Sequence, residues 1–258
     1  MQGTDPTAYD ASFAHLCAGT HAHLLDRVRE VVRPPGALLD VGTGTGMLAR
    51  RASEAGFLVT GVDHDPGMLA AATARAPGAR FALGTLPALA VADGAFDAAV
   101  ANFVINHVAD PRASVAEMHR CVRPGGVAAT AIWGTFPNPL AVVWDAMIEL
   151  SGAYRPAPAT LDPALEFERT PEGLAGLHRA AGASDVDAGE LSWTWTVVPA
   201  DVWRAVAGGV AGIGAVYRAN TAGTQEAMRV AFDAITSGLA VDGALHLESR
   251  AVWAIATA

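Results

Sequence analysis

Three alternating glycines, Gly42, Gly44 and Gly46, separate an apolar run from a helical pattern, and they constrain the fold more than any other feature. Glycine lets the backbone turn sharply, and its missing side chain lets a ligand lie against the bare main chain. A helix that begins directly after such a turn offers free N–H groups and a partial positive charge to a ligand. The segment is therefore predicted to be a strand, a glycine loop and a helix, in that order.

Strand and helix patterns continue to alternate through the first half of the chain. Asp65-Pro66 and Asp110-Pro111 each place a cap acceptor before a proline at the first helical position. Arg123–Gly126 is expected to end the second of these helices before a strand begins. Such alternation with short links predicts a parallel sheet covered by helices on both faces. The predicted strands are 37–41, 57–63, 80–83, 96–102 and 127–133.

The second half is predicted to add helices and two further strands. A helix near 140–150 precedes an irregular stretch marked by Pro156, Pro158 and Pro163, and Thr170-Pro171 begins another helix. Residues 192–197 alternate with period two, as in a strand with one buried face. We expect a single α/β domain over 1–258. Its parts are a core of about 34–134, 171–199 and 244–258, and a helical cap of about 7–33, 135–170 and 200–243.

The charge balance narrows the choice of partners. The chain has a formal net charge of −9, 52% hydrophobic and 17% charged residues, and all 17 of its basic residues are arginine. Nucleic acids and acidic membrane surfaces are recognised through many cations, so we expect neither as a partner. No apolar run approaches the roughly 18 residues that span a bilayer, and the first residues do not resemble a signal peptide. Cys17 and Cys121 are expected to be reduced thiols of a cytoplasmic protein.

An acid at the end of the second predicted strand indicates what the glycine loop binds. A glycine loop alone is also compatible with a tight turn that holds no ligand. Asp63 lies where a carboxylate accepts hydrogen bonds from a ribose diol, and Asp40 lies inside the first strand. A dinucleotide fingerprint needs a third glycine at the position of Met47, which disfavours a nicotinamide or flavin cofactor. These residues favour a nucleoside site of another kind.

Five segments together resemble the class I S-adenosylmethionine-dependent methyltransferases, in the order and spacing of that family. The subgroup resembled is that of small-molecule enzymes of the ubiquinone and menaquinone biosynthesis type, which are common in natural-product pathways. The resemblance implies a Rossmann-like, seven-stranded, mostly parallel sheet with an antiparallel last strand. Residues 193–197 and 245–257 fit the terminal hairpin. The matching segments are 39–46, 62–69, 92–97, 102–111 and 123–126.

The resemblance also implies roles around the cofactor S-adenosyl-L-methionine. The glycine loop would pack against its methionine part, Asp63 would bind the ribose hydroxyls, and Thr85-Leu86 would read the adenine. His64 and Met68 would flank the adenine, and Asn102 and Phe103 would lie beside the sulfonium and line the substrate mouth. Thr85 departs from the acidic residue usual at its position, so it offers a hydroxyl without charge. The implied cofactor-binding residues are Tyr9, Gly42, Thr43, Gly44, Gly46, Asp63, His64, Met68, Thr85, Leu86, Asn102 and Phe103.

Methyl transfer needs a nucleophile, a methyl group and a sulfur held in line, and it needs a base only when the acceptor loses a proton. His107 is the candidate base or substrate-orienting group, because the ordinary pKa of histidine is close to neutral. The alternative is a histidine that is hydrogen-bonded to backbone between a strand and a helix. We predict no metal ion.

Two functions stay open for the whole chain. The first is methyl transfer to O, N or C of a hydrophobic small-molecule metabolite. The second is a biosynthetic cyclisation, decarboxylation or rearrangement on the same fold, with the cofactor not reacting. Trp133, Trp144 and Trp203 would either line an apolar substrate pocket or pack helices together. Neither the methyl acceptor nor the oligomeric state follows from these patterns.

Overall fold

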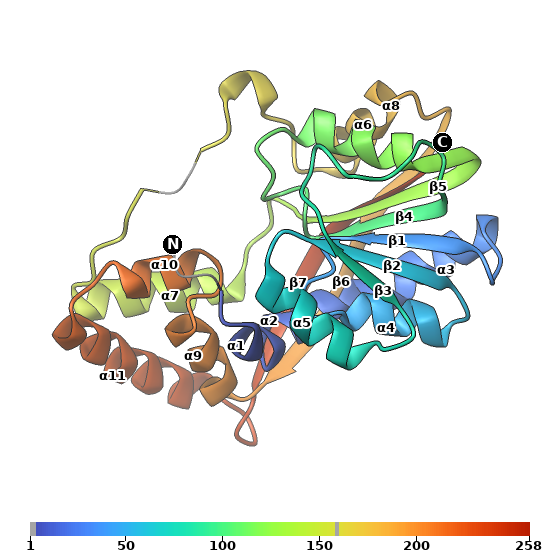
Figure 1. The fold of residues 1–258 in the computed structure, drawn as a ribbon. Helices are drawn as coiled ribbons and strands as arrows, with labels where there is room; N and C mark the ends of the chain where they lie inside the picture. Colours follow the sequence, from blue (N-terminus) through green and yellow to red (C-terminus); the bar gives the residue numbers. More distant parts are fainter. Residues whose placement is uncertain (1–3, 158–159) are drawn as a thin grey trace. The chain divides into compact units, whose positions relative to one another are not determined.

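The computed structural model describes residues 4–157 and 160–258, and its strands form one seven-stranded sheet (Figure 1). Pro158 and the first three residues of the chain lie outside the described residues. The strand order is β3-β2-β1-β4-β5-β7-β6, with parallel pairing from β3 to β5 and antiparallel pairing of β7 with β5. The predicted Rossmann-like sheet is confirmed. Its strands are β1 (Ala37–Val41), β2 (Leu58–Asp63), β3 (Arg80–Leu83), β4 (Phe96–Asn102), β5 (Val122–Trp133), β6 (Asp185–Val197) and β7 (Leu245–Thr257).

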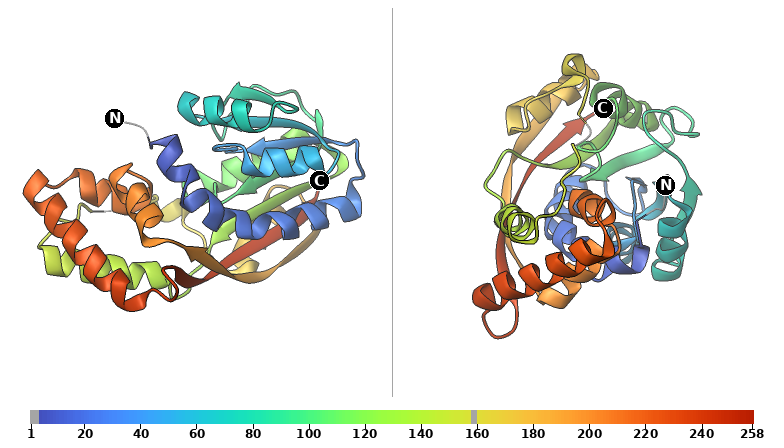
Figure 2. Two further views of the ribbon diagram at one scale, coloured as in Figure 1. Left: turned by 90° about the horizontal axis from the view of Figure 1, so that it is seen from below. Right: turned by 90° about the vertical axis from the view of Figure 1, so that its left-hand side faces the viewer.

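Helices cover both faces of the parallel strands. On one face lie α3 (His21–Val31), α4 (Met47–Glu54) and α5 (Pro66–Arg75), of which α3 and α4 are on the near side in the left panel of Figure 2. On the other face α6 (Pro111–Cys121) packs against β5 and against α8 (Pro171–Ala180). Crossovers on opposite faces follow from a strand order that reverses between β1 and β4.

The predicted helix starts are confirmed in atomic detail. The Asp65 carboxylate accepts hydrogen bonds from the N–H groups of Gly67 and Met68, and Asp110 accepts one from Ala113. Each cap satisfies backbone donors that have no partner within the first helical turn, and each is followed by a proline that needs none. Local sequence therefore fixes where these helices begin.

The main hydrophobic core lies between the sheet and the face that carries α3 and α4. Leu24 and Val28 of α3 and Ala49 of α4 are fully buried there against Leu38 and Ala98 of the sheet. Alanine recurs at the buried positions of β4 and β5, which lets the helices approach the sheet closely. The Ala-rich composition is thus partly a packing requirement of the central strands.

The chain divides into two compact units. One consists of Met1–Leu16, Phe136–Thr160 and Ser192–Ser249, and the other holds the remaining residues and the parallel strands. The division into core and cap made above stays a prediction. The helices of the first unit are α1 (Pro6–Asp10), α7 (Pro139–Ser151), α9 (Pro199–Ala207), α10 (Ala211–Arg218) and α11 (Ala222–Leu239), and α2 (Phe13–Cys17) crosses the boundary.

Aromatic packing organises the helical unit. Trp144 of α7 stacks on Phe232 of α11 with ring centroids 6.0 Å apart, and Trp203 of α9 lies 5.4 Å from the same ring. The ring of Tyr217 meets Trp203 edge to face. The interpretation of Trp144 and Trp203 as helix-packing residues is therefore confirmed within this unit.

Three strand starts differ from those expected, that of β2 by a single residue. Arg123–Gly126 does not separate α6 from β5, because β5 already begins at Val122, and the pairing of β4 with β5 shifts its register after Phe96. Strand β6 begins at Asp185 and not near 192. Its Gly189 resembles a loop residue in the sequence, yet a Cβ there would lie 2.9 Å from Trp253 Cζ2, so the close approach of that ring requires glycine.

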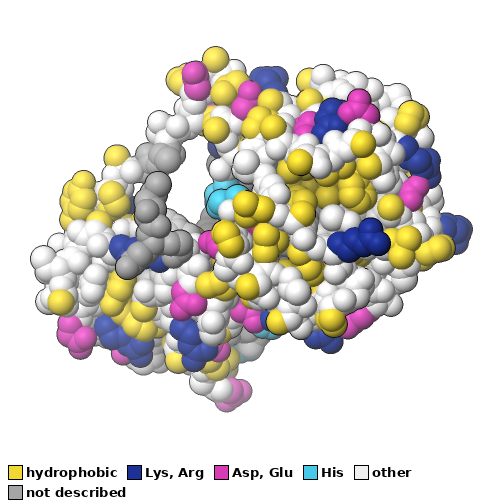
Figure 3. Space-filling model, in the orientation of Figure 1, with side chains coloured by type: hydrophobic (Ala, Val, Ile, Leu, Met, Phe, Trp, Pro, Cys, Tyr) yellow, Lys and Arg dark blue, Asp and Glu magenta, His cyan; other side chains and the backbone are white. Residues whose placement is uncertain are grey.

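Other expectations concern what the chain does not contain. Both cysteines are free thiols, as predicted. Among the described residues, no helix is long and apolar enough to cross a membrane, and no three His, Cys, Asp or Glu side chains gather as a metal site. On the face drawn in Figure 3, the arginine side chains of the coloured residues lie apart from one another. That face therefore presents no broad basic surface.

Candidate cofactor site

The glycine loop adopts the left-handed backbone that its residues predict. Gly42, Gly44 and Gly46 have φ angles of 67°, 55° and 81°, a region that favours glycine. The N–H groups of Gly42 and Thr43 donate to Val62 O at 2.8 and 2.9 Å, which ties the loop to β2. The loop is thus held rigidly between the ends of two parallel strands.

Two of these glycines also allow close packing. A Cβ on Gly46 would lie 2.9 Å from Ala72 Cα of α5, and a Cβ on Gly42 would lie 2.4 Å from Val104 Cγ2. An added Cβ would meet the backbone of α5 at Gly46 and the Val104 side chain at Gly42. The loop therefore needs glycine for its backbone angles and for its contacts with two different segments.

Asp40 joins strand, loop and helix beneath the glycines. Its buried carboxyl accepts a hydrogen bond from Thr43 Oγ1 at 2.6 Å and is also hydrogen-bonded to the backbone of Ala49, in the first turn of α4. Burial raises the pKa of Asp40 to about 7, against the opposing effect of the Thr43 hydrogen bond. Asp40 thus acts as a cap for α4 from the neighbouring strand.

Asp63 ends β2 directly beside the loop. Its Oδ2 accepts from Gly44 N at 2.8 Å and its Oδ1 accepts from Asp65 N at 3.0 Å. A carboxylate has about four lone-pair positions, so two remain for further donors. His64 Nδ1 lies 3.2 Å from Asp63 Oδ1, and its imidazole is exposed. The geometry thus leaves Asp63 able to accept hydrogen bonds from a diol, as its predicted role requires.

The predicted adenine-binding residues lie on two segments that follow β2 and β3. Met68 is buried on α5, whereas Thr85 is exposed after β3. Gly84 N donates to Asp63 O at 2.9 Å, which joins the start of the Thr85-Leu86 segment to the end of β2. The ribose and adenine positions implied by the resemblance are therefore connected through one backbone hydrogen bond.

Asn102 and Phe103 lie at the carboxyl end of β4. Asn102 Oδ1 accepts from Thr20 Oγ1 at 2.7 Å, and its Nδ2 donates to Cys17 O at 3.0 Å. Both polar atoms of this amide therefore hold the segment before α3. Phe103 has a positive φ of 58°, uncommon for a bulky residue, and its ring stacks on Trp133 with centroids 3.9 Å apart.

The role of Asn106 was not predicted from the sequence. Its Nδ2 donates to Trp133 O at 3.2 Å, and its Oδ1 accepts from Trp133 N at 2.7 Å. One amide thus satisfies both backbone groups of the last residue of β5 and holds it beside the loop that carries Phe103. In the sequence, Asn106 is noticeable as a polar residue within the largely apolar segment 103–108. That pattern does not reveal which strand end its side chain binds.

His107 and Tyr9 have different surroundings. The backbone N–H of His107 donates to Val104 O, and desolvation by the surrounding protein lowers the pKa of its imidazole. A neutral imidazole at pH 7 can accept a proton, as a base must. Tyr9 belongs to the helical unit, where it packs against Ala8, Ala205 and Val210. The roles of all these site residues stay predictions.

The described residues fit a nucleoside. The loop glycines present bare main chain, and Asp63 has acceptor positions beyond those used by its two backbone donors, one of them within reach of His64. In open α/β sheets, ligands bind beyond the carboxyl ends of the strands, at the point where the strand order reverses. Here that point lies between β1 and β4, next to Gly42 and Phe103.

Comparison with known proteins shows sequence similarity to methyltransferases. The family model of the methyltransferase domain matches residues 39–130. The malonyl-[acyl-carrier protein] O-methyltransferase of Pseudescherichia vulneris is 30% identical over 203 residues, covering 70% of this chain and 79% of that protein. The demethylmenaquinone methyltransferase of Renibacterium salmoninarum is 38% identical over 93 residues, but the match spans only 39% of that protein and 36% of this chain.

Similarity in fold extends further. The structure of phosphoethanolamine N-methyltransferase 2 from Haemonchus contortus, in complex with phosphomonomethylethanolamine and S-adenosylhomocysteine, superposes with a TM-score of 0.57 at 17% identity, covering 98% of this chain and 56% of that one. The chain belongs to the class I S-adenosylmethionine-dependent methyltransferases. Its cofactor is S-adenosyl-L-methionine.

Proposed function

We propose that this protein transfers the methyl group of S-adenosylmethionine to an O, N or C atom of a hydrophobic small molecule in a biosynthetic, natural-product type pathway. The observation that carries the proposal is the stack of Phe103 on Trp133 at the carboxyl ends of β4 and β5. These strands end where ligands bind in this fold, and two aromatic rings there favour an apolar acceptor. Asn106 holds the end of β5 that carries Trp133.

The chain's own residues would orient the reactants. The bound cofactor supplies an electrophilic methyl group on a sulfonium sulfur. Gly42, Gly44 and Gly46 would hold the methionine part, and Asp63 would fix the ribose. His107 would accept the proton of an acceptor that must lose one, since its pKa lies below the ordinary value. An acceptor without such a proton would need orientation alone.

Product analysis tests the proposal directly. The protein would be incubated with S-adenosylmethionine and separate panels of phenols, quinols, carboxylic acids and amines. Formation of S-adenosylhomocysteine together with a product heavier by one methyl group is expected for a hydrophobic acceptor. A product of unchanged mass or one that has lost carbon dioxide, with no S-adenosylhomocysteine formed, would instead support cyclisation, rearrangement or decarboxylation.

A pair of carboxylate variants ties the activity to the site. Asp63→Asn should weaken cofactor binding, because an amide cannot accept from both Gly44 N and Asp65 N. Asp97→Asn is the matched control, since Asp97 also accepts a backbone N–H, that of Ala37, but at the opposite ends of the strands. Equal affinity of Asp63→Asn and wild type for S-adenosylmethionine would contradict the role of Asp63.

A further inference from the structure

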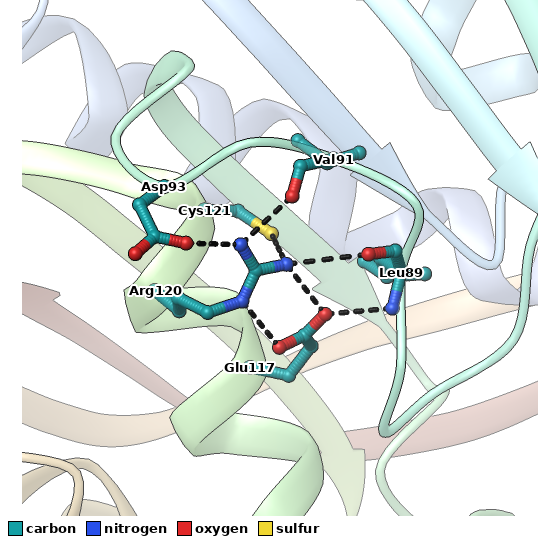
Figure 4. A network of polar contacts seen from close by, with 6 residues as sticks. All are labelled: Leu89, Val91, Asp93, Glu117, Arg120 and Cys121. Carbon is teal, nitrogen blue, oxygen red and sulfur yellow. Dashed lines mark hydrogen bonds and ion pairs between the residues drawn. The ribbon is translucent and has the colours of Figure 1, made fainter.

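Arg120, on α6, binds the segment that connects β3 to β4 (Figure 4). Its Nη1 donates to Val91 O at 2.7 Å and to Asp93 Oδ1 at 2.5 Å, and its Nη2 donates to Leu89 O at 3.2 Å. Two of these three acceptors are main-chain carbonyls. The guanidinium therefore fixes the path of the backbone and does not merely neutralise a charge.

Glu117 completes the arrangement one helical turn earlier. Its Oε1 accepts from Leu89 N at 2.6 Å, and its two oxygens accept from Arg120 Nη2 and Nε at 2.8 and 2.7 Å. The hydrogen bond from Arg120 lowers the pKa of Glu117 and keeps it ionised. Together the two side chains bind both the N–H and the C=O of Leu89.

The Leu89 side chain packs close to Gly84, the residue that follows β3. Leu89 is buried, and a Cβ on Gly84 would lie 3.4 Å from Leu89 Cδ2. Gly84 is itself held by the hydrogen bond from its N–H to Asp63 O. Between these two anchors the chain makes a short turn in which Ala88 N donates to Thr85 O at 3.2 Å. Thr85 and Leu86 therefore lie between two fixed residues. Gly84 is bound to Asp63, and Leu89 is bound by Glu117 and Arg120.

We propose that Glu117 and Arg120 are positioning residues that set the adenine specificity of the cofactor site by holding the Thr85-Leu86 turn. The proposal rests on the proposed function and on the adenine-binding role that the family resemblance implies for that turn. An ordinary exposed ion pair contributes little and would leave ligand selectivity unchanged. This pair differs because the Glu117 side chain is only 11% exposed and because both partners bind main-chain atoms of Leu89, the residue that follows the Thr85–Ala88 turn.

The test compares two ligands that differ only in the base. Dissociation constants for S-adenosylhomocysteine and S-inosylhomocysteine would be measured by calorimetry on wild type, Arg120→Lys and Arg120→Ala. Lysine keeps the charge but, with three donor hydrogens, cannot donate at once to all five oxygen atoms that accept from Arg120. Loss of one well-placed hydrogen bond to the base corresponds to about tenfold in affinity. We expect the preference for the adenosyl ligand to fall by about tenfold in both variants, with faster amide exchange in residues 85–91.

Arg123→Lys is the matched control. Arg123 Nε donates to Asp97 Oδ1, so it forms a similar ion pair that does not involve the Thr85-Leu86 turn. This variant should keep the wild-type preference. An unchanged preference in Arg120→Lys, or an equal loss of affinity for both ligands, would overturn the proposal even if Arg120→Ala fails to fold. A wild type that binds both ligands equally would remove the adenine role and this proposal with it, whereas the methyl-transfer proposal is judged separately by its product.

Discussion

The Nε2 atom of His119 on α6 lies 2.9 Å from the Nδ1 atom of His178 on α8, and the Nε2 atom of His178 lies 2.8 Å from Thr130 Oγ1 on β5. All three side chains are buried. A neutral imidazole has one donor and one acceptor nitrogen, so a chain of hydrogen bonds can pass through both rings while both are neutral, and burial disfavours the charged form of each ring. The histidine pair therefore joins two helices to the sheet as an uncharged group.

Acid should weaken this connection. Burial lowers the pKa of His119 to about 4, and burial together with neighbouring His119 lowers the pKa of His178 to about 3. The unfolded chain binds these protons near pH 6.5, whereas the folded protein does not, so stability is lost as the pH falls from about 6.5 toward 4. Each histidine should contribute about 1–2 kcal/mol of this loss between pH 7 and pH 5.

Proton NMR and urea unfolding would check the histidine prediction. The ring signals of His119 and His178 should not shift between pH 8 and pH 5. His119→Gln keeps a donor for His178 but cannot titrate, so its unfolding free energy should fall less over this range than that of wild type. Ring signals that titrate near 6.5 would show that the pair is not held neutral.

Asp40 should give a pH dependence of opposite sign. Because burial raises the pKa of Asp40 to about 7, the folded state keeps a proton that the unfolded state releases near 3.8. The contribution of this group to stability is then present below pH 3.8 and is lost as the pH rises to 7. Asp40→Asn cannot ionise, so its unfolding free energy relative to wild type should increase steadily from pH 4 to pH 7.

Asp97→Asn provides the control for this series. A hydrogen bond from Arg123, supported by the Ala37 N–H, lowers the pKa of Asp97, so its ionised form stabilises the folded state. Relative to wild type, Asp97→Asn should lose stability as the pH rises through the acid range, opposite to Asp40→Asn. A constant difference between Asp40→Asn and wild type at every pH would show that Asp40 does not titrate in this window.

Local signals in the sequence were sufficient for much of this fold. The bounds of β1, β3, β4 and β7 follow from apolar runs between turn residues, and the proline caps mark α5 and α6. The predicted starts of strands were wrong where contacts with residues distant in the sequence determine them. β5 begins at Val122 because it pairs there with Phe96, and β6 continues through Gly189 because Trp253 covers that residue. Neither contact leaves a pattern in the segment that it changes.

In the candidate site, too, features that depend on residue type could be predicted, whereas contacts with distant backbone atoms could not. The glycine loop and Asp63 could be predicted, because backbone freedom and charge belong to the residue types themselves. The i,i+3 spacing of Glu117 and Arg120 is compatible with an ion pair along a helix, but no such pair was predicted. Their binding to the backbone of Leu89 could not be predicted, since main-chain acceptors are present at every position. Asn106, which binds the backbone of Trp133, escaped prediction for the same reason.

Gly46→Ala should damage both the loop and its packing. Gly46 has a φ of 81°, and a Cβ would lie 2.9 Å from Ala72 Cα and 3.3 Å from Ala72 O, neither of which can move without displacing α5. The backbone angle alone costs about 1–2 kcal/mol, to which the clash adds. Thermal unfolding should therefore shift down by several degrees, with weaker binding of S-adenosylmethionine. Gly78→Ala, with open space around its Cβ, should match wild type in both measurements.

His107→Gln tests whether the reaction uses a base. If His107 accepts the acceptor's proton, kcat should fall roughly 10²–10⁴-fold while the affinity for S-adenosylmethionine is kept. Because desolvation lowers the pKa of His107, wild-type kcat should decline only at a pH below 6.5, and this acid limb should vanish in the variant. His246→Gln, at an exposed histidine of β7, is the control and should keep the wild-type profile. An acid limb that persists in His107→Gln would assign the titration to another group and leave His107 to orient the acceptor.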